Sequence, residues 1–598
     1  MSGPSTETPL PERQWLEDLK RQNPDVDPDN VRYLAEREKR HLANHDHQAS
    51  VKQISTQVER FYENNQHFRI YHGSTNSTRR TKFDPTRMVD TSSLNHVLHV
   101  DRQQMTALVE PNVPMDSLVS YLQPYDLVPP VVMEFPGITV GGGFAGTSGE
   151  SSSFKYGFFD KTVTRIEIVL GDGRVLHASD TEHEDLFKAA AGSFGTFGVV
   201  TALELKLVPS TFWVELKYWP IKSIAEALDV IQERVKDESI DYLDGILYEK
   251  NLGVIVTGRR HNQKSLNGRE VVRFSRDYDP WFYLHAQCVL QCSTSCRQPC
   301  SLKCKANSVA PVSDKTKVME PYTDHTPVAD YLFRYDRGAF WTGRYAFSYF
   351  LVPFTWLTRL ILDYFMHTRV MYHALHESGQ SDLYIIQDLA IPLSSTEKFI
   401  EYLDDEFKLY PLWLCPLKPT DDGEKSFHPV GKGNGEMLIN VGVWGPGPRT
   451  RPAFVQKNRE LEAKVRELGG MKWLYAQAYY TAEEFWSIYD REWYDALRKK
   501  WNAQRLPNVY DKVKTDVEDN RSIKRKIMMA IWPLSGIYGV LKALLGGSYL
   551  TAVADRRGAS FLGLGWVPIA LVFAATVPAV LLSRSPKGRS EIIACLDS

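Results

Sequence analysis

Residues 139–151 constrain the fold of this chain more than any other stretch. They read TVGGGFAGTSGES, and five glycines fall within residues 141–149. Glycine removes side-chain bulk and lets backbone N–H groups approach a ligand, so this composition is typical of a loop that meets a diphosphate. The spacing differs from the G-x-G-x-x-G of a Rossmann unit, and we expect neither a preceding parallel strand nor a helix that opens here. A flexible surface turn is the alternative interpretation.

The size and charge of the chain exclude several classes of protein. With 598 residues it is long enough for two or three domains and a sizeable core. Its 71 Lys and Arg residues nearly balance 73 Asp and Glu residues, so no overall field favours nucleic acid as a partner. No apolar signal segment opens the chain, so we expect a reducing compartment without a disulfide framework.

Periodic apolar residues predict an α+β domain in the first third of the chain. A helical pattern runs from about residue 30 to 65, and Val51, Ile54, Val58 and Phe61 form its apolar stripe. Short strand-like runs and one helix follow, at residues 68–71, 97–100, 106–109, 163–176, 184–191 (the helix) and 199–208. Strands mixed with helices indicate an α+β domain that ends near Pro209.

The last eighty residues have a membrane-like pattern. Residues 561–582 carry no charge over 22 positions and are flanked by basic residues on both sides. About 20 apolar residues cross a bilayer as a helix, so we expect a transmembrane helix, with a buried core helix as the alternative. Residues 527–541 are shorter and contain Pro533, which favours an interfacial or re-entrant segment.

An ordered series of motifs resembles the FAD domain of the vanillyl-alcohol-oxidase/p-cresol-methylhydroxylase (PCMH) superfamily. The series consists of the glycine-rich segment, the Gly171-Asp172-Gly173 turn and residues 185–201. Within that superfamily, several stretches are similar to the Δ24-sterol reductase family, also called 24-dehydrocholesterol reductase or Diminuto/seladin. These stretches are TVGGGFAGTSGESSSFKYGFFD (139–160), DLFKAAAGSFGTFGVVTALELKLVP (185–209), YPLWLCP (410–416), LYAQAYYTAEEFW (474–486) and VYDK (509–512). The resemblance covers roughly residues 48–515.

The resemblance implies a domain order and an activity. We expect a polar tail and helix start at 1–47, a two-subdomain PCMH-type FAD-binding domain at 48–210, an α+β substrate domain at 211–515 and a basic, membrane-associated end at 516–598. The implied activity is an FAD-dependent reduction of the side-chain Δ24 double bond of a sterol, with NADPH as hydride source. Members of the family carry an N-terminal anchor, so the resemblance does not imply a topology for the C-terminal segment here. We expect an endoplasmic reticulum membrane location with the catalytic domain in the cytosol, because the larger basic cluster lies upstream of the span at Lys512, Lys514, Arg521, Lys524, Arg525 and Lys526. An oxidase, desaturase or isomerase acting on another isoprenoid, or a non-catalytic membrane-tethered flavoprotein, remains open.

The resemblance also implies which residues contact FAD. These are Gly73, Ser74, Thr75, Asn76, Ser77, Thr139, Val140, Gly141, Gly142, Gly143, Phe144, Ala145, Gly146, Thr147, Ser148, Gly149, Glu150, Ser151, Gly195, Gly198 and Val199. Many relatives link FAD covalently through a His in an R-G-G-G-H-S-type loop. Here His72 precedes Gly73 and no His follows in that loop, so we expect non-covalent FAD.

Reducing an alkene requires an acid as well as a hydride donor. Tyr475, Tyr156 and Lys155 lie in the family-like stretches and are the candidate proton donors. Core packing is the alternative role for Tyr475, and contact with flavin or its phosphates is the alternative for Lys155 and Tyr156. No metal site is expected.

A cluster of cysteines interrupts the resemblance between about residues 288 and 318. Five cysteines occur at every fourth position, namely Cys288, Cys292, Cys296, Cys300 and Cys304. Thiols on one helical face could bind zinc or an iron–sulfur cluster, but Pro299 would break the helix and the spacing lacks the usual paired ligands. The open interpretations are an inert insertion, an intron retained in frame, and a metal or redox site.

Overall fold

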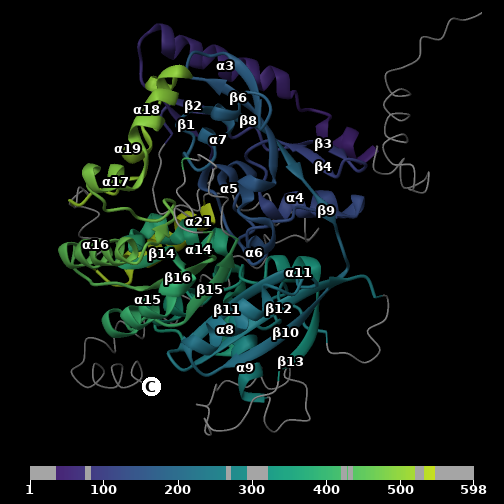
Figure 1. Cartoon of the computed structure of the whole chain (residues 1–598), viewed down its shortest axis with the longest axis vertical. Helices are drawn as coiled ribbons and strands as arrows, with labels where there is room; N and C mark the ends of the chain where they lie inside the picture. The colour runs from purple at the N-terminus through teal and green to yellow at the C-terminus, as the bar shows by residue number, and fades with distance from the viewer. Residues whose placement is uncertain are drawn as a thin grey trace, which may run out of the picture.

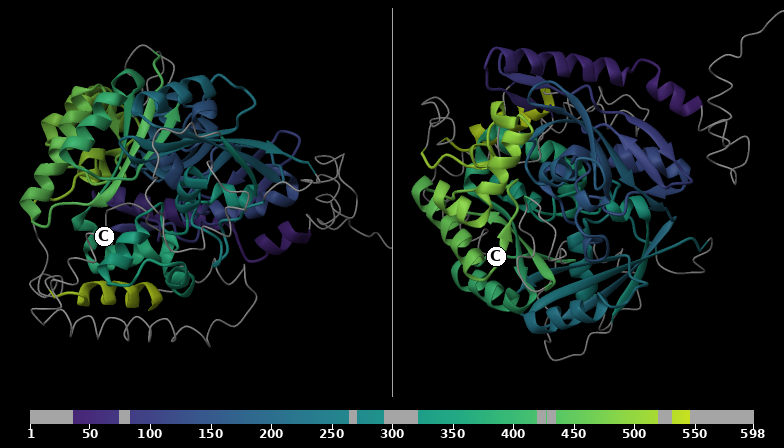
Figure 2. Two further views of the ribbon diagram at one scale, coloured as in Figure 1. Left: turned by 90° about the horizontal axis from the view of Figure 1, so that it is seen from below. Right: turned by 45° about the horizontal axis from the view of Figure 1, so that its top comes forward.

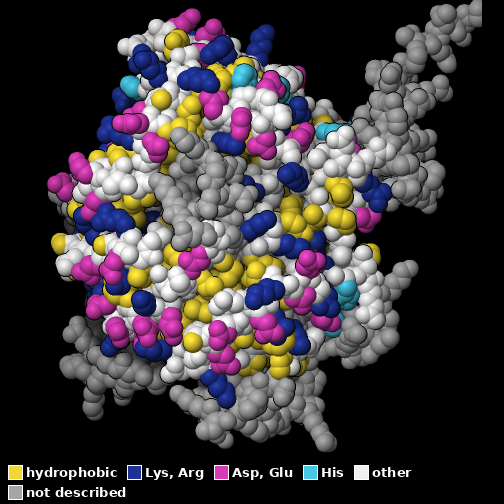
Figure 3. All heavy atoms as spheres, in the orientation of Figure 1, with side chains coloured by type: hydrophobic (Ala, Val, Ile, Leu, Met, Phe, Trp, Pro, Cys, Tyr) yellow, Lys and Arg dark blue, Asp and Glu magenta, His cyan; other side chains and the backbone are white. Residues whose placement is uncertain are grey.

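Two α+β units lie one above the other in the computed structural model (Figure 1). Each unit is built around its own sheet, so the mixed α+β class expected from the sequence is confirmed. Lysine and arginine side chains are interspersed with aspartate and glutamate over the face in Figure 3, as the near balance of charge predicts. The structure describes residues 36–73, 83–263, 271–292, 321–418, 427, 435–518 and 531–545.

The first unit contains a five-stranded antiparallel sheet in the order β3-β4-β8-β6-β7. Its strands are β3 (Val97–Asp101), β4 (Thr106–Val109), β6 (Val163–Leu170), β7 (Val175–Ser179) and β8 (Gly198–Lys206). Two short pairs accompany the sheet: β1 (Arg69–Tyr71) with β2 (Met88–Asp90), and β5 (Leu127–Val128) with β9 (Val208–Pro209). The strands predicted in this part of the chain are confirmed, within a few residues at their ends.

The helices of the first unit are α3 (His47–Glu63), α4 (Met115–Leu122), α5 (Val140–Gly146), α6 (Ser153–Tyr156) and α7 (Glu184–Ala190), with the 3-10 turns η1 (Gln123–Tyr125) and η2 (Phe159–Thr162). The predicted apolar stripe of α3 is confirmed, because all four of its residues are buried. The single helix expected at 30–65 is wrong in the part that the structure describes. It is interrupted at residues 43–46, where the Asp46 side chain accepts a hydrogen bond from the Ala49 N–H and starts α3.

The second unit contains an eight-stranded antiparallel sheet in the order β13-β10-β12-β11-β15-β16-β14-β17. Its strands are β10 (Trp213–Ile221), β11 (Tyr242–Glu249), β12 (Leu252–His261), β13 (Tyr322–Pro327), β14 (Tyr384–Pro392), β15 (Leu412–Leu417), β16 (Leu438–Pro446) and β17 (Met471–Lys472). Helices α8 (Ile224–Arg234), α15 (Leu393–Glu406) and α16 (Arg451–Glu467) bury their apolar sides against one face of it.

Side chains along β14 alternate between the two faces of this sheet. Ile385, Leu389 and Ile391 belong to the core beneath the helices, whereas Asp388 between them faces the opposite side. Successive side chains of a strand point to opposite faces, so every second residue of β14 is directed away from the helices. This face of the sheet can therefore present polar groups to a ligand.

The remaining helices are α9 (Phe282–Cys292), α11 (Val328–Leu332), α12 (Gly343–Tyr349), α13 (Trp356–Leu362), α14 (Thr368–Ser378), α17 (Ala482–Ile488), α18 (Arg491–Lys500), α19 (Val509–Val513) and α21 (Leu534–Leu545), with η3 (Asp363–Met366), η4 (Gln380–Leu383) and η5 (Ala503–Arg505). After β17 the chain returns to the first unit, where α18 lies beside α7 (Figure 1). Tyr494 donates a hydrogen bond to Thr196 at 2.8 Å there. The stretch predicted as one substrate domain thus ends on the first unit.

The predicted cysteine-rich insertion begins inside a packed helix. Cys288 belongs to α9, and Cys288, Val289 and Leu290 are all buried in the core. The insertion predicted at about residues 288–318 stays a prediction, and its first three residues are part of this packed core. Residues 293–318, with Cys296, Cys300 and Cys304, lie outside the described residues.

Within the described residues, no helix has the length and apolar character needed to cross a bilayer. The predicted span at 561–582 lies outside the described residues, as do residues 527–530 of the predicted interfacial segment. The rest of that segment enters α21, which lies at one side of the molecule along the lower edge of the left view in Figure 2. Gly539 lets α21 approach α14, because a Cβ there would meet the Ala374 carbonyl oxygen at 2.3 Å.

Candidate functional site

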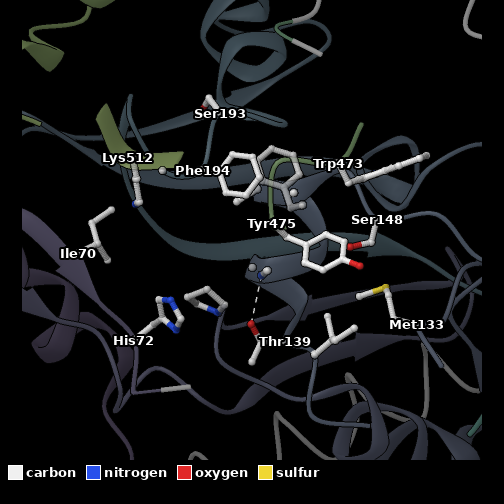
Figure 4. Close-up of a pocket in the computed structure, with 18 of the residues that line it drawn as sticks. Ile70, His72, Met133, Thr139, Ser148, Ser193, Phe194, Trp473, Tyr475 and Lys512 are labelled. Carbon is white, nitrogen blue, oxygen red and sulfur yellow. Dashed lines mark hydrogen bonds between the residues drawn. The ribbon is translucent and has the colours of Figure 1, made fainter. Parts of the chain in front are cut away.

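A cavity of about 1030 Å³ lies between the two units. Its walls come from α5 and residues 193–200 of the first unit and from β14, β16 and residues 473–477 of the second. Figure 4 shows Ile70, His72 and Lys512 on one side of it and Trp473 and Tyr475 on the other. Ligand sites commonly enclose about 300–1,000 Å³, so this cavity is suited to a large ligand.

The glycine-rich segment is a short helix rather than the loop that we expected. Thr139 caps α5, since its hydroxyl accepts a hydrogen bond from the Gly142 N–H at 3.1 Å. The N–H groups of Val140 and Gly141 are also used within the protein, donating to the carbonyls of Val113 and Pro111. The expectation was wrong because glycine has a low intrinsic helix propensity. In this structure the Thr139 cap and the packing of α5 stabilise the helix in spite of that propensity.

The glycines of α5 have two different functions. A Cβ on Gly141 would lie 2.7 Å from Pro111 Cβ, and one on Gly143 would lie 2.6 Å from Met133 Cε. These two glycines are therefore needed for packing. Gly146 also lines the cavity, yet a Cβ there would meet no atom within 4 Å. Its missing side chain leaves space that a ligand can occupy.

Most of the predicted FAD contacts that the structure describes line the cavity. They are Gly73, Thr139, Gly141, Gly142, Phe144, Ala145, Gly146, Ser148, Gly149, Gly195, Gly198 and Val199. The other described ones, which are not among its lining residues, are Val140, Gly143, Thr147, Glu150 and Ser151. Ser74, Thr75, Asn76 and Ser77 lie outside the described residues. Gly73 and Gly195 have φ values of +71° and +69°, a conformation that favours glycine.

Of the three candidate proton donors, the structure places only Tyr475 in the cavity wall. Its hydroxyl donates a hydrogen bond to Asp388. Lys155 instead forms an ion pair with Asp241 at 3.2 Å, and Tyr156 accepts a hydrogen bond from Arg260 at 3.4 Å. Both belong to α6, whose side chains are not part of the cavity wall. The prediction for these two residues is therefore not supported, because closeness in sequence to α5 did not bring them to the site.

Several cavity residues were missed from the sequence. Asp388, Asn440 and Trp444 come from β14 and β16, Trp413 from β15 and Tyr372 from α14. The four strand residues share one signal, because each is a polar or aromatic residue within a largely apolar strand, whereas Tyr372 on α14 has no such signal. Gly442 keeps this wall open, since a Cβ there would lie 3.1 Å from both Asp388 Oδ1 and Trp413 Cβ. Because β14 carries no other charged residue, Asp388 could have been singled out by its position in the strand.

The comparisons with known proteins agree with this geometry. Residues 47–179 match the family model described as an FAD binding domain. Delta(24)-sterol reductase of Homo sapiens is 28% identical over 486 residues, which cover 78% of this chain and 86% of that protein. The Pisum sativum enzyme of the same name is 28% identical over 475 residues, 73% of this chain and 78% of that protein. The chain is an FAD-dependent oxidoreductase that resembles the Delta(24)-sterol reductases. Cytokinin dehydrogenase 9 of Oryza sativa subsp. japonica is 29% identical over 155 residues, 25% of this chain and 29% of that protein.

The α5 side of the cavity includes lysine side chains, one of which is paired with Asp511. Lys512 and Lys514 line the cavity, and Lys512 Nζ would lie 3.7 Å from a Cβ on Gly195. Burial lowers the pKa of His72 to about 4, and the Lys512 charge adds to this effect. His72 is therefore neutral at physiological pH, and the Lys512 ammonium is suited to an anionic group such as a phosphate.

The opposite side of the cavity holds buried acidic groups. Burial raises the pKa of Asp388 to about 6, although hydrogen bonds from Tyr475 and Asn440 oppose the rise. Burial and the neighbouring Glu150 raise the pKa of Glu134 well above its ordinary value. Glu150 accepts a hydrogen bond from the Ser151 N–H at 2.7 Å. This side can therefore store protons near neutral pH.

A separate group of ionisable residues lies at the start of α3. His45 and His47 each lie 2.7 Å from Glu110 Oε1, and the other ring nitrogen of His47 lies 3.0 Å from Glu167. We call these four residues the N-terminal clamp. His45, His96 and Glu110 bring potential metal-ligand atoms within 4.8 Å of one another. The His45 and His96 rings are stacked, however, with an interplanar angle of 13°. Stacked rings cannot both direct a nitrogen lone pair at one ion, so we interpret the group as a hydrogen-bond network.

Proposed function

We propose that this protein reduces the side-chain Δ24 double bond of a sterol, with FAD as cofactor and NADPH as the source of hydride. Similarity to Delta(24)-sterol reductases over most of both chains supports the reaction. The structural observation that carries the proposal is one continuous cavity with a glycine-lined, lysine-bearing side and an aromatic, acidic side. The first suits a dinucleotide and the second suits an apolar substrate that must receive a proton.

The residues on the α5 side fit FAD. Gly142 and Gly146 present no side chain to the cavity, and Lys512 supplies a positive charge for the diphosphate. When bound, FAD supplies hydride transfer to the substrate. The protein must therefore hold the cofactor, keep the alkene beside it and deliver the proton. FAD is proposed to bind without a covalent link.

The aromatic side fits the sterol side chain. Trp413, Trp444 and Tyr372 line this part of the cavity. Positive charge builds on an alkene carbon as a proton arrives, and aromatic faces stabilise such charge without reacting with it. Tyr475 provides the O–H group in this wall. The same aromatic residues limit water, which would otherwise trap the developing cation.

We also propose that the protein works at the endoplasmic reticulum membrane with its FAD site in the cytosol, where NADPH is present. Leu357 and Ile361 of α13 and Leu534 of α21 are exposed apolar residues, and such surfaces suit contact with lipid. Truncation after Leu545 should release folded flavoprotein from membranes under carbonate extraction, while the full chain should remain bound. Protection of the FAD site from protease in intact microsomes would contradict the proposed orientation.

The test of the reaction uses the full chain, purified with its flavin, under anaerobic conditions. NADPH should bleach the flavin, and a sterol with a Δ24 double bond should then restore its absorbance and gain two hydrogens. The matched control is the same sterol with a saturated side chain, which should leave the flavin reduced. An enzyme that NADPH does not reduce, or that turns over only with oxygen, would favour an oxidase instead. Purified protein without flavin would favour a non-catalytic role.

A further inference from the structure

Asp388 and Tyr475 form a pair in the cavity wall. The Tyr475 hydroxyl donates to Asp388 Oδ2, and the Asn440 amide donates to Asp388 Oδ1 at 3.3 Å. Asp388 is 8% exposed, and both members of the pair line the cavity. The alternation of β14 fixes the carboxyl on this face, and Gly442 on the neighbouring strand leaves room for it. The pair is therefore held in place by the sheet.

Tyr475 cannot protonate an alkene by itself in this setting. Its proton is directed at Asp388 whenever that carboxyl group is charged. Losing the proton would leave a phenolate in a buried site, where burial and the Asp388 charge raise the pKa of Tyr475 well above 10. A phenol with such a pKa can give up its proton only if its oxygen receives another in the same step. The nearest group able to supply it is Asp388.

The surroundings of Asp388 keep that second proton available. Burial raises the pKa of Asp388 to about 6, and the Glu150 charge adds to the rise, while hydrogen bonds from Tyr475 and Asn440 oppose it. The other ionisable groups near the pair are Glu134 and Tyr372, and burial raises the pKa values of both. The main causes of the shifted pKa of Asp388 include no lysine or arginine, so its protonated form remains accessible near neutral pH.

We propose that Asp388 is a positioning residue that reprotonates Tyr475 while Tyr475 protonates the alkene. This inference rests on the proposed function and names the proton path for it. The π electron pair forms a C–H bond with the Tyr475 proton as the O–H bond breaks. The Asp388 O–H bond breaks as the phenol O–H bond is restored, and the other alkene carbon takes the hydride. Asp388 is left as a carboxylate and regains a proton from water.

The first test is the pH dependence of the two half-reactions of the wild-type holoenzyme, followed by stopped-flow absorbance. Sterol reduction should need protonated Asp388, so its rate should fall about tenfold per pH unit above about pH 6. Flavin reduction by NADPH should lack this decline, because it needs no proton from the pair. A sterol-reduction rate that stays constant up to about pH 8 would overturn the inference and leave the proposed function intact. Failure of the wild type to reduce the sterol at any pH would overturn the proposed function itself.

The second test is a double-mutant cycle on the same half-reaction. Asp388→Asn and Tyr475→Phe should each slow sterol reduction by about 100-fold or more, and the double variant should be no slower than the single ones. If the two groups act as one unit, removing either one abolishes the relay and removing both causes no further loss. Additive losses would therefore contradict the pairing. The NADPH half-reaction and the flavin content of each variant should match wild type. If Asp388→Asn does not bind flavin, Tyr475→Phe and the wild-type pH profile still decide the question.

The third test needs neither cofactor nor activity. Infrared difference spectra of the flavin-free protein, taken below and above about pH 6, should contain a buried carboxylic-acid band that Asp388→Asn removes. Tyr475→Phe should shift this band, because the partner of the carboxyl group is lost. A spectrum of Asp388→Asn identical to that of wild type would show that Asp388 carries no proton in this pH range, and the relay would then be excluded.

Discussion

Glu110 and Asp388 are both buried carboxyl groups, but different partners surround them. In the N-terminal clamp, Glu110 accepts hydrogen bonds from the side chains of His45 and His47 and from the His96 N–H. Burial alone would raise its pKa, but these donors lower it below the ordinary value. In the cavity, Asp388 receives hydrogen bonds from neutral side chains, and its pKa rises to about 6.

The difference separates a structural use of a buried carboxyl group from a functional one. The clamp ties the start of α3 to the end of β4 and the middle of β6, and the positive charge on His47 compensates its carboxylates. In the cavity no cation neutralises Asp388, so the folded state holds a group that would be more stable in water. Clamp substitutions should therefore reduce stability without affecting flavin, whereas removing the charge of Asp388 should not reduce stability.

The largest effect should come from filling the space that Gly146 leaves in the cavity. Gly146→Val should abolish flavin binding while the melting temperature of the flavin-free protein stays near wild type, because a Cβ there meets no atom within 4 Å. Absorbance of the purified protein and thermal melting give the two measurements. Gly143→Val is the matched control from the same helix. Its side chain would collide with Met133 and Phe159, so it should cost about 1–3 kcal/mol of stability. Stoichiometric flavin in Gly146→Val would disprove this assignment of the site.

The second effect concerns the clamp. Glu110→Ala should lower the free energy of unfolding by about 3–5 kcal/mol, because His45 and His47 lose the buried carboxylate between them. Flavin content per folded molecule should stay at the wild-type level. Chemical denaturation followed by tryptophan fluorescence measures the first quantity. Glu184→Ala, which removes an exposed carboxylate, should change stability by less than about 0.5 kcal/mol. A folded Glu110→Ala protein that has lost its flavin would break the distinction between the two regions.

The local structure of the first unit was accessible from the sequence. Apolar residues recur with a period of 3.6 along α3 and with a period of 2 along the strands at 163–176 and 199–208. Each of these periods shows which face of the element is buried. The glycine-rich part of the cavity wall was found through its glycines, since a close approach between backbone and ligand excludes other residues. The sequence pattern did not distinguish glycines needed for ligand binding from glycines needed for packing. Gly143 was expected to contact FAD, but a glycine is required there because Met133 and Phe159 leave no room for a Cβ.

The acidic side of the cavity could not be derived in the same way. Asp388 and Tyr475 are 87 residues apart and meet only because β14 lies next to the chain that leaves β17. Lys155 and Tyr156 showed the converse error, since closeness to α5 in sequence was taken as closeness to the ligand. Register between distant strands depends on the whole sheet, and no local pattern in one sequence encodes it.

The third prediction exploits the unfavourable burial of Asp388. Its folded-state pKa is raised from 3.8 to about 6, so it contributes stability below pH 3.8 that is lost as pH rises through about 6. Asp388→Asn removes the buried charge and should raise the free energy of unfolding by about 2 kcal/mol at pH 8, since each pKa unit corresponds to about 1.4 kcal/mol and weakened hydrogen bonds reduce the gain. Denaturation at several pH values should show the gain disappear toward pH 4. A variant that is less stable than wild type at pH 8 would mean that Asp388 is structural, like Glu110.

The smallest effect should come from replacing His47. Its contribution to stability is lost as pH rises, whereas the contribution of the clamp's carboxylates is lost as pH falls. Burial would lower the pKa of His47, but hydrogen bonds to Glu110 and Glu167 raise it to about 9. Because this value exceeds the unfolded value of 6.5, the stabilisation is complete below pH 6.5 and is lost as pH rises through about 9. His47→Gln should lower the free energy of unfolding by about 1 kcal/mol at pH 6, because one neutral amide replaces a charged ring between two carboxylates. The difference from wild type should shrink above about pH 9, and denaturation curves at the two pH values measure it. An equal difference at both pH values would show that the His47 ring acts by packing and not by charge, and the clamp would then not be the electrostatic counterpart of the cavity.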